Sequence, residues 1–169
     1  TEPDPSGGGV RPISSLSRKT KAFWNICSQA GLKSVVVGWW PSTPAEPIRG
    51  VMVSNHFQKA AAQGKPWRLP PHMVHPPRLL KNLAALRVNP ATLNEGHLLP
   101  FVPRAAEVDQ DKDQRLFNIA KIAAESMSIR NAAQAILHHE PWDVAAVYFD
   151  AIDHFSHGFM RLHPPRLPW

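Results

Sequence analysis

The sequence has 169 residues, of which 43% are hydrophobic; this length and composition give about one domain with a buried core and exclude general disorder. Nineteen Lys and Arg against thirteen Asp and Glu leave a formal net charge of +6, which suits an anionic partner. The single cysteine, Cys27, excludes an intramolecular disulfide and a thiolate cluster, so a bound metal needs His, Asp or Glu ligands.

The two ends of the chain suggest its context. Residues 1–14 are rich in Gly and Pro and predict a flexible lead-in without the regions of a signal peptide, and no apolar run is long enough to span a membrane. The chain opens without methionine and stops just after its densest cluster of polar functional groups. We therefore expect a central fragment of a longer protein, whose compartment and oligomeric state stay open.

The first half of the chain alternates helical and extended patterns. Apolar residues recur at helical spacing over residues 17–30, and Gly31 follows as a stop. Residues 32–39 (LKSVVVGW) predict a short buried strand, and residues 48–54 (IRGVMVS) predict a second strand or extended segment. Residues 57–62 predict one or two helical turns. This alternation is typical of an α/β domain.

The second half begins with a Pro-rich region. Residues 64–103 predict an insertion that covers one end of the sheet, too rich in proline before residue 77 for regular structure, with a short helix at 79–86. Residues 111–139 form the strongest helical region, which Ser126 to Ser128 divide into two. Its two apolar stripes are Leu116, Ile119, Ala120, Ala123 and Met127, and Ala132, Ala133, Ile136 and Leu137.

The stretch 143–160 runs from an apolar strand into a cluster of acids and imidazoles. Ligands of open α/β sheets bind beyond the carboxyl ends of parallel strands. If the chain turns helical from Ile152, Asp153 and His157 share one face, where a carboxylate oxygen and an imidazole nitrogen can reach one divalent cation at about 2.0–2.2 Å. Asp150 and His154 widen this face, and His154 is better suited to orient a ligand than to be one. The alternative is that these groups cap the helix or pair with each other.

Three segments carry motifs in a recognisable order. Residues 22–57 hold a helix, a strand that ends near Trp-Pro, and an E-x-x-x-G-x-M-V-S stretch that begins at Glu46. Residues 76–103 are rich in Pro and Leu, and residues 143–160 hold an apolar strand, a D-x-x-x-H motif and an aromatic residue, Phe159. In this order they resemble the type I phosphodiesterase/nucleotide pyrophosphatase family of the alkaline phosphatase superfamily.

The resemblance covers most of residues 15–165 and implies one partial hydrolase domain: part of a doubly wound, mostly parallel α/β sheet with flanking helices and two divalent metal ions, commonly zinc. In that family a Thr or Ser attacks the phosphorus of a phosphate ester, and water then hydrolyses the phospho-enzyme. By this match Asp153 and His157 are ligands of the metal that activates the water. The family's nucleophile and its other ligands are not identifiable in this sequence, so the chain alone is expected to be inactive.

Other side chains are candidates on their chemistry alone. His163 lies near the motif and is a candidate substrate contact. His72 and His75 have ligand-like spacing without an accompanying acid, and Cys27 falls on the apolar face of its helix. Hydroxyls near predicted strand ends lack a G-x-S-x-G context and are expected to cap turns: Ser42, Thr43 and Ser54. Three tryptophans are expected to have packing or capping roles: Trp39, Trp40 and Trp67.

A second hypothesis is a non-catalytic α/β module whose basic face binds phosphorylated or nucleic-acid partners. Arg18, Lys19 and Lys21 stand beside Trp24 at the predicted start of a helix, where cations oppose the helix dipole and favour a bound anion. No nucleic-acid-binding fold or aromatic platform is evident in the sequence, and solvated lysines are the ordinary interpretation. Nucleic-acid binding is therefore disfavoured.

Overall fold

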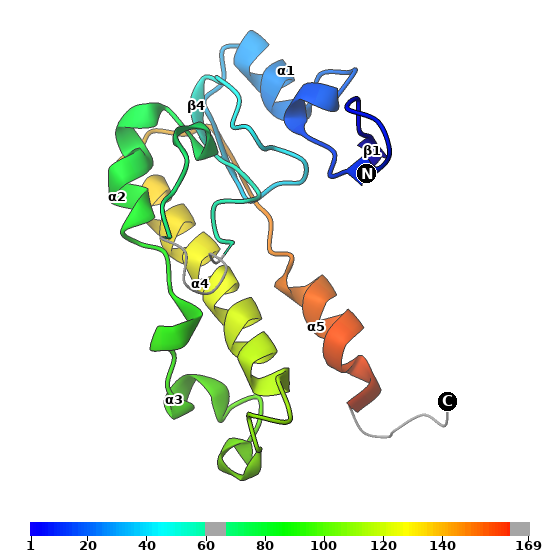
Figure 1. Cartoon of the computed structure of the whole chain (residues 1–169). Coiled ribbons are helices and arrows are strands. Elements are labelled where there is room, and N and C mark those ends of the chain that lie inside the picture. Colours follow the sequence, from blue (N-terminus) through cyan, green and yellow to red (C-terminus); the bar gives the residue numbers. More distant parts are fainter. Residues whose placement is uncertain (60–66, 163–169) are drawn as a thin grey trace.

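A four-stranded sheet lies at the centre of the molecule. The computed structural model describes residues 1–59 and 67–162 (Figure 1). The strands of this sheet are β3 (Ser34–Val37), β4 (Gly50–Val53), β5 (Val74–His75) and β6 (Val144–Val147), in the order β5-β4-β3-β6. Strand β3 pairs in parallel with both β4 and β6, whereas β5 pairs antiparallel with β4. The fold is therefore mixed α/β, as the alternating sequence pattern predicts.

Five α-helices accompany the sheet. They are α1 (Phe23–Gln29), α2 (Leu80–Ala84), α3 (Glu95–Leu98), α4 (Arg115–His139) and α5 (Ala151–Phe159) among the described residues. Short 3-10 helices span Ser15–Ser17, Pro71–Met73, Pro77–Leu79, Pro90–Thr92, Ala105–Glu107 and Met160–Leu162. Within residues 1–14, β1 (Glu2–Pro3) and β2 (Val10–Arg11) form a separate antiparallel pair. None of the helices described combines the length and the apolar character that a membrane crossing requires.

The two faces of the sheet are covered by different helices. Side chains alternate between the faces of a strand, so Val36 points away from its neighbours Val35 and Val37. Val35 and Val37 pack in one cluster with Ile129 and other residues of α4, and Val36 packs in a second cluster with Trp24 of α1. The three valines are fully buried. Strand β3 is thus sandwiched between α4 and α1.

Helix α4 is a single helix of 25 residues. The predicted division at Ser126 to Ser128 is wrong, because the buried stripe continues through Ala124, Ser128 and Ile129 without a break. Ser128 suits this position since its hydroxyl donates to the carbonyl of Ala124 at 2.8 Å and accepts from the amide of Val88 at 2.8 Å. The side chain therefore satisfies its polar atoms inside the helix interface instead of ending the helix.

Residues 67–103 run alongside α4 (Figure 1). The side-chain amide of Asn131 in α4 donates to the carbonyl of Leu86 at 3.1 Å, which ties the end of α2 to the long helix. The prediction of no regular structure before residue 77 is wrong at β5, because Val74 and His75 pair with β4. Of the helical turns predicted for residues 57–62, the structure gives bends and no helix through Lys59, and residues 60–62 lie outside the described part.

Strand β6 is the edge of the sheet and is only partly buried. Its pattern is apolar, as predicted, but the described residues provide a neighbour on one side only, which is β3. Tyr148 and Phe149, which follow the strand, keep 40% and 39% of their surface exposed. The predicted apolar strand thus lies at an edge of the sheet, and among the described residues no second strand covers it.

Gly50 allows β3 and β4 to approach each other at the start of their parallel pairing. Its φ is +131°, in a region that residues with a side chain rarely adopt. A Cβ atom built on Gly50 would lie 2.1 Å from the carbonyl oxygen of Ser34, its partner in the register. A side chain at this position would have to displace backbone, not a mobile side chain.

We expect Gly50→Ala to lower the free energy of unfolding by about 2–4 kcal/mol, since it adds both backbone strain and a clash between strands. Urea denaturation followed by circular dichroism measures the change. The matched control is Gly158→Ala in α5, where the added Cβ meets no atom within 4 Å. That substitution should be neutral or stabilise by up to about 1 kcal/mol. Equal stability of Gly50→Ala and the wild type would contradict the role assigned to Gly50.

Candidate functional site

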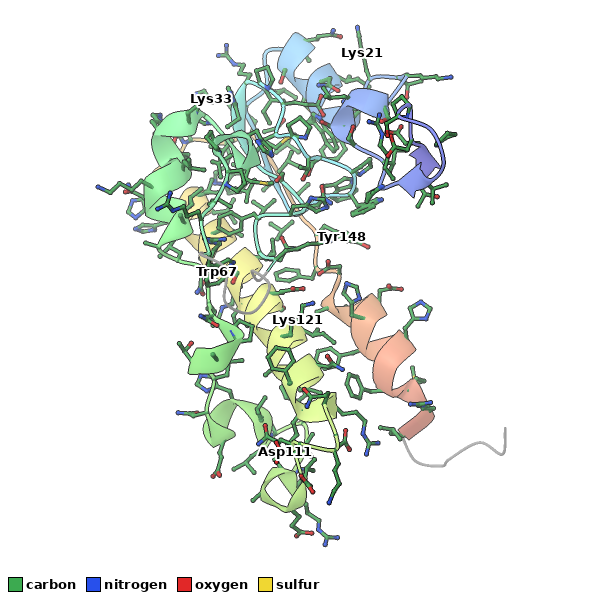
Figure 2. The ribbon with its side chains drawn as sticks, in the orientation of Figure 1. Lys21, Lys33, Trp67, Asp111, Lys121 and Tyr148 are labelled. Atoms are coloured by element: carbon green, nitrogen blue, oxygen red, sulfur yellow. The ribbon has the colours of Figure 1, made fainter. Side chains whose placement is uncertain are left out.

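The carboxyl ends of three parallel strands meet at one edge of the sheet. Because β3 is parallel to β4 and β6, the segments that follow them, residues 38–43, 54–59 and 148–157, leave the sheet on the same side. The amide of Tyr148 donates to the carbonyl of Val37 at 2.9 Å and keeps the exit of β6 beside that of β3. Tyr148 lies where the chain passes from the sheet to α5 (Figure 2).

Asp153 and His157 form an exposed pair on α5. Helical spacing places them on one face, as predicted, and Asp153 Oδ1 lies 3.3 Å from His157 Nε2. Two atoms that bind one zinc ion tetrahedrally at about 2.0–2.2 Å stand about 3.3–3.6 Å apart. The separation of these two atoms therefore fits two ligands of one metal ion. It fits an ordinary ion pair equally well. The side chains are 63% and 83% exposed, so a further ligand has room to approach.

Asp150 and His154 form a second pair, nearer to α4. Their Oδ2 and Nε2 atoms are 3.5 Å apart, and the two side chains are 28% and 50% exposed. His154 borders a cleft that also contains Lys121 and Glu125 of α4. Burial raises the pKa of Glu125, and the charge of Asp150 raises it further against the opposing effect of Lys121. Among the described residues no hydrogen bond joins His154 to Asp153 or His157, so its orienting role stays a prediction.

The described residues contain no group of three or more His, Cys, Asp or Glu side chains arranged to hold a metal ion. Asp153 and His157 are thus at most half of a four-coordinate site. His163, the candidate substrate contact, lies outside the described residues. Glu125 is missed by sequence reasoning, although an acid on the buried stripe of a helix is a signal that could have found it.

The other histidines and hydroxyls have structural neighbours. His72 is exposed, whereas the Nε2 atom of His75 lies 3.2 Å from the carbonyl oxygen of Ile48. Ser54 is fully buried, and its hydroxyl donates to the sulfur of Met73 at 3.1 Å. The hydroxyl of Ser42 accepts from the amide of Asn55, and that of Thr43 donates to Asn55 Oδ1, so both join two loops instead of capping turns. Cys27 is partly buried in α1.

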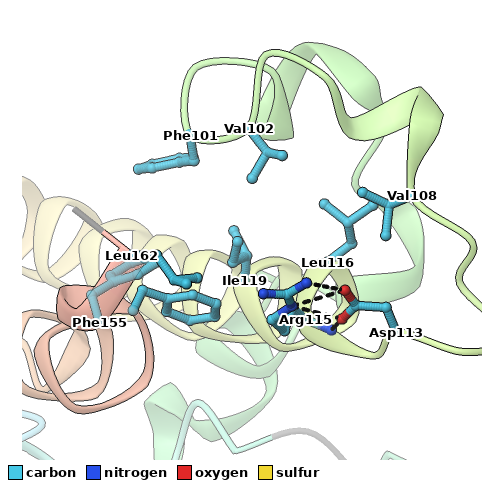
Figure 3. A pocket seen from close by; sticks show the side chains of 10 residues that line it. Phe101, Val102, Val108, Asp113, Arg115, Leu116, Ile119, Phe155 and Leu162 are labelled. Atoms are coloured by element: carbon cyan, nitrogen blue, oxygen red, sulfur yellow. Dashed lines mark hydrogen bonds and ion pairs between the residues drawn. The ribbon is translucent and has the colours of Figure 1, made fainter. Parts of the chain in front are cut away.

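An apolar cavity of about 480 Å³ lies between α5, the start of α4 and residues 101–108 (Figure 3). Phe155 and Phe159 of α5 and Leu116 and Ile119 of α4 line it, together with Phe101 and Val102. Residues 153 and 155 of a helix point in nearly opposite directions, so this cavity and the Asp153–His157 pair do not share a face. The apolar face of α5 serves packing against α4, and the polar pair is directed away from it.

Asp113 and Arg115 form an ion pair at the cavity wall (Figure 3). Side-chain and backbone hydrogen bonds from Arg115 lower the pKa of Asp113 to about 2. The guanidinium of Arg115 is therefore already neutralised by a carboxylate, which leaves it poorly suited to recognise an anionic ligand in the cavity.

Arg18 does not belong to a free basic patch. Its Nη2 atom donates to Glu46 Oε2 at 2.6 Å, and its guanidinium lies 5.2 Å from the ring centroid of Trp24. Asn25 donates to the same Oε2 atom at 3.1 Å, and Trp24 donates to Oε1 at 3.3 Å. Burial opposes ionisation of Glu46, but the hydrogen bonds from Arg18 and Asn25 outweigh it and lower its pKa. This network joins α1 to the loop between β3 and β4.

Comparison with known proteins gives no match to a family model, to a curated protein or to a solved structure. The function must therefore be argued from the geometry of this chain.

We expect Glu46→Gln to lower the free energy of unfolding at pH 7 by about 1–2 kcal/mol, because it weakens charge-assisted hydrogen bonds. The pKa of Glu46 in the folded state lies below its ordinary value of 4.5, so ionised Glu46 stabilises the fold above that pH. This stabilisation is lost as the pH falls through the folded pKa. The difference between wild type and Glu46→Gln, measured by urea denaturation from pH 7 to pH 3, should shrink below about pH 4.5.

Glu107→Gln is the matched control, since Glu107 pairs with Arg104 on the surface, where the two side chains are 59% and 80% exposed. It should change the free energy of unfolding little. A difference between wild type and Glu46→Gln that is the same at pH 7 and pH 3 would show that the charge of Glu46 does not stabilise the fold.

Proposed function

We propose that this chain contributes part of one metal site to a metal-dependent hydrolase of phosphate esters, of the phosphodiester or nucleotide pyrophosphate class. The observation that carries the proposal is the 3.3 Å separation of Asp153 Oδ1 and His157 Nε2 on an exposed helical face. Helix α5 begins at Ala151, four residues after the parallel strand β6 ends at Val147, where α/β hydrolases place their ligands. Asp153 and His157 are also the Asp and His of the D-x-x-x-H motif in the family that the sequence resembles.

Asp153 and His157 would hold a divalent ion, with zinc favoured by the combination of one carboxylate and one imidazole. A divalent ion there would supply Lewis-acid polarisation of a phosphoryl group, and the family that the sequence resembles uses two such ions. The role of Asp153 and His157 is to bind and position. Asp150 and His154 lie next to this face of α5, where we expect them to orient the two ligands.

The proposal also includes the architecture of a doubly wound, mostly parallel sheet. Support comes from β3, β4 and β6, which are parallel, and from the helices α1 and α4 on opposite faces. In this proposal a longer parent chain supplies the nucleophile, the remaining ligands and further strands beyond β6. Residues 64–103 act as a cap in the complete domain.

The test is hydrolysis of bis-p-nitrophenyl phosphate by the full-length parent chain, with zinc and with a chelator. Asp153→Ala and His157→Ala should each lower kcat/KM at least about a hundredfold, because loss of a ligand costs more than loss of its support. Asp150→Ala and His154→Ala should cost about tenfold. Asp111→Ala, in the segment just before α4 (Figure 2), is the control and should leave turnover unchanged.

Turnover that resists the chelator, or that is unchanged in both Asp153→Ala and His157→Ala, would reject the metal site. Failure to hydrolyse any phosphate ester with any divalent metal would favour the non-catalytic binding module. Circular dichroism and thermal unfolding of each variant would exclude misfolding as the cause, since both side chains are exposed and should tolerate replacement.

A further inference from the structure

Trp40 is exposed at the carboxyl edge of the sheet, although the sequence favours a packing role for it. Its surface is 48% exposed, whereas Trp24 is 2% exposed and Trp39 is partly buried between Phe23 and Tyr148. An indole that is half in water is an aromatic surface without a complete packing partner.

A histidine and a lysine from a neighbouring strand end stand beside this indole. The ring centroids of Trp40 and His56 are 6.2 Å apart, and the Nζ atom of Lys59 lies 6.0 Å from the Trp40 centroid. Trp40 follows β3, whereas His56 and Lys59 follow β4, so the parallel pairing of the two strands brings the three side chains together. We call these three residues the Trp40 surface.

A buried hydrogen-bond network holds the two loops of the Trp40 surface in place. Asn55 Oδ1 accepts from the amide of Ser42 at 2.9 Å and from the hydroxyl of Thr43 at 3.0 Å. The amide of Asn55 donates in return to the hydroxyl of Ser42 at 3.0 Å. Ser42 is fully buried and Asn55 is 4% exposed. The Trp40 surface is thus presented by cross-linked loops, and little order has to be gained when a ligand binds.

The charge beside the indole is positive. Lys59 is exposed and forms no ion pair with any residue in the described ranges 1–59 and 67–162. Burial lowers the pKa of His56, and the charges of Lys59 and His72 lower it further. Lys59 is also within electrostatic reach of Glu125 in α4, a buried acid with a raised pKa.

We infer that the Trp40 surface binds a planar aromatic group that carries a negative charge. The exposed part of the indole offers a surface for stacking, and the ammonium of Lys59, which lies over the ring, offers a charge-assisted hydrogen bond to the anionic group. An aliphatic anion would leave the exposed part of the indole uncovered, and a neutral arene would give the ammonium no anionic partner. The inference does not depend on the proposed hydrolysis, because none of the three residues belongs to the Asp153–His157 pair.

The test is ligand-detected NMR titration of the chain with phenyl phosphate, inorganic phosphate and phenol, all in EDTA. Phenyl phosphate should bind at least about tenfold more tightly than either inorganic phosphate or phenol, because only it meets both the indole and the ammonium. Trp40→Ala should weaken phenyl phosphate binding at least about tenfold, with Trp40→Phe in between, and Lys59→Gln about threefold to tenfold.

Trp142→Ala is the matched control. The exposed fraction of Trp142 is 47%, similar to that of Trp40. Trp142 lies just before β6, at the amino end of the parallel strands, and its indole N–H donates to the carbonyl of Leu137 at 3.2 Å. Its replacement should leave phenyl phosphate binding unchanged. Equal binding of phosphate and phenyl phosphate, or an unchanged affinity in Trp40→Ala, would overturn the inference. Since EDTA removes divalent ions, the outcome of this titration does not depend on whether Asp153 and His157 bind a metal.

Discussion

The parallel pairing of β3 with β4 on one side and β6 on the other is the constraint on which both candidate sites depend. It brings the segments after residues 37, 53 and 147 to one edge of the sheet, although the last lies far along the chain. Burial of Val35, Val36 and Val37 on both faces of β3 stabilises this arrangement, and the absence of a side chain at Gly50 permits it.

Helix α5 separates packing from chemistry by the directions of its side chains. Phe155 and Phe159 point toward α4 and line the apolar cavity, so the helix is held through this face. Asp153 and His157 occupy the opposite, exposed face, where they are free to meet a metal ion or another segment. Because the polar pair lies on the other side of α5 from the apolar contacts, it does not disturb the packing that positions the helix.

The regular elements were largely predictable because they depend on local patterns. The apolar run around Val35 predicted strand β3, and the apolar stripe after residue 111 predicted the helical region of α4, each within a few residues at the ends. The predicted break at Ser128 was wrong because a hydroxyl that binds its own helix and a neighbouring amide costs little inside a helix. Strand β5 was missed since its two residues owe their conformation to β4 and not to their own pattern.

The sequence by itself determined the α/β class and the spacing of Asp153 and His157, because a four-residue interval on a helix sets which side chains share a face. Tertiary structure decided which groups became neighbours across the chain. It turned Arg18 toward Glu46 instead of solvent, brought the buried Glu125 within electrostatic reach of Asp150, and gathered Trp40, His56 and Lys59 on one surface. These contacts depend on how strands pair and helices pack, and no local spacing encodes that pairing.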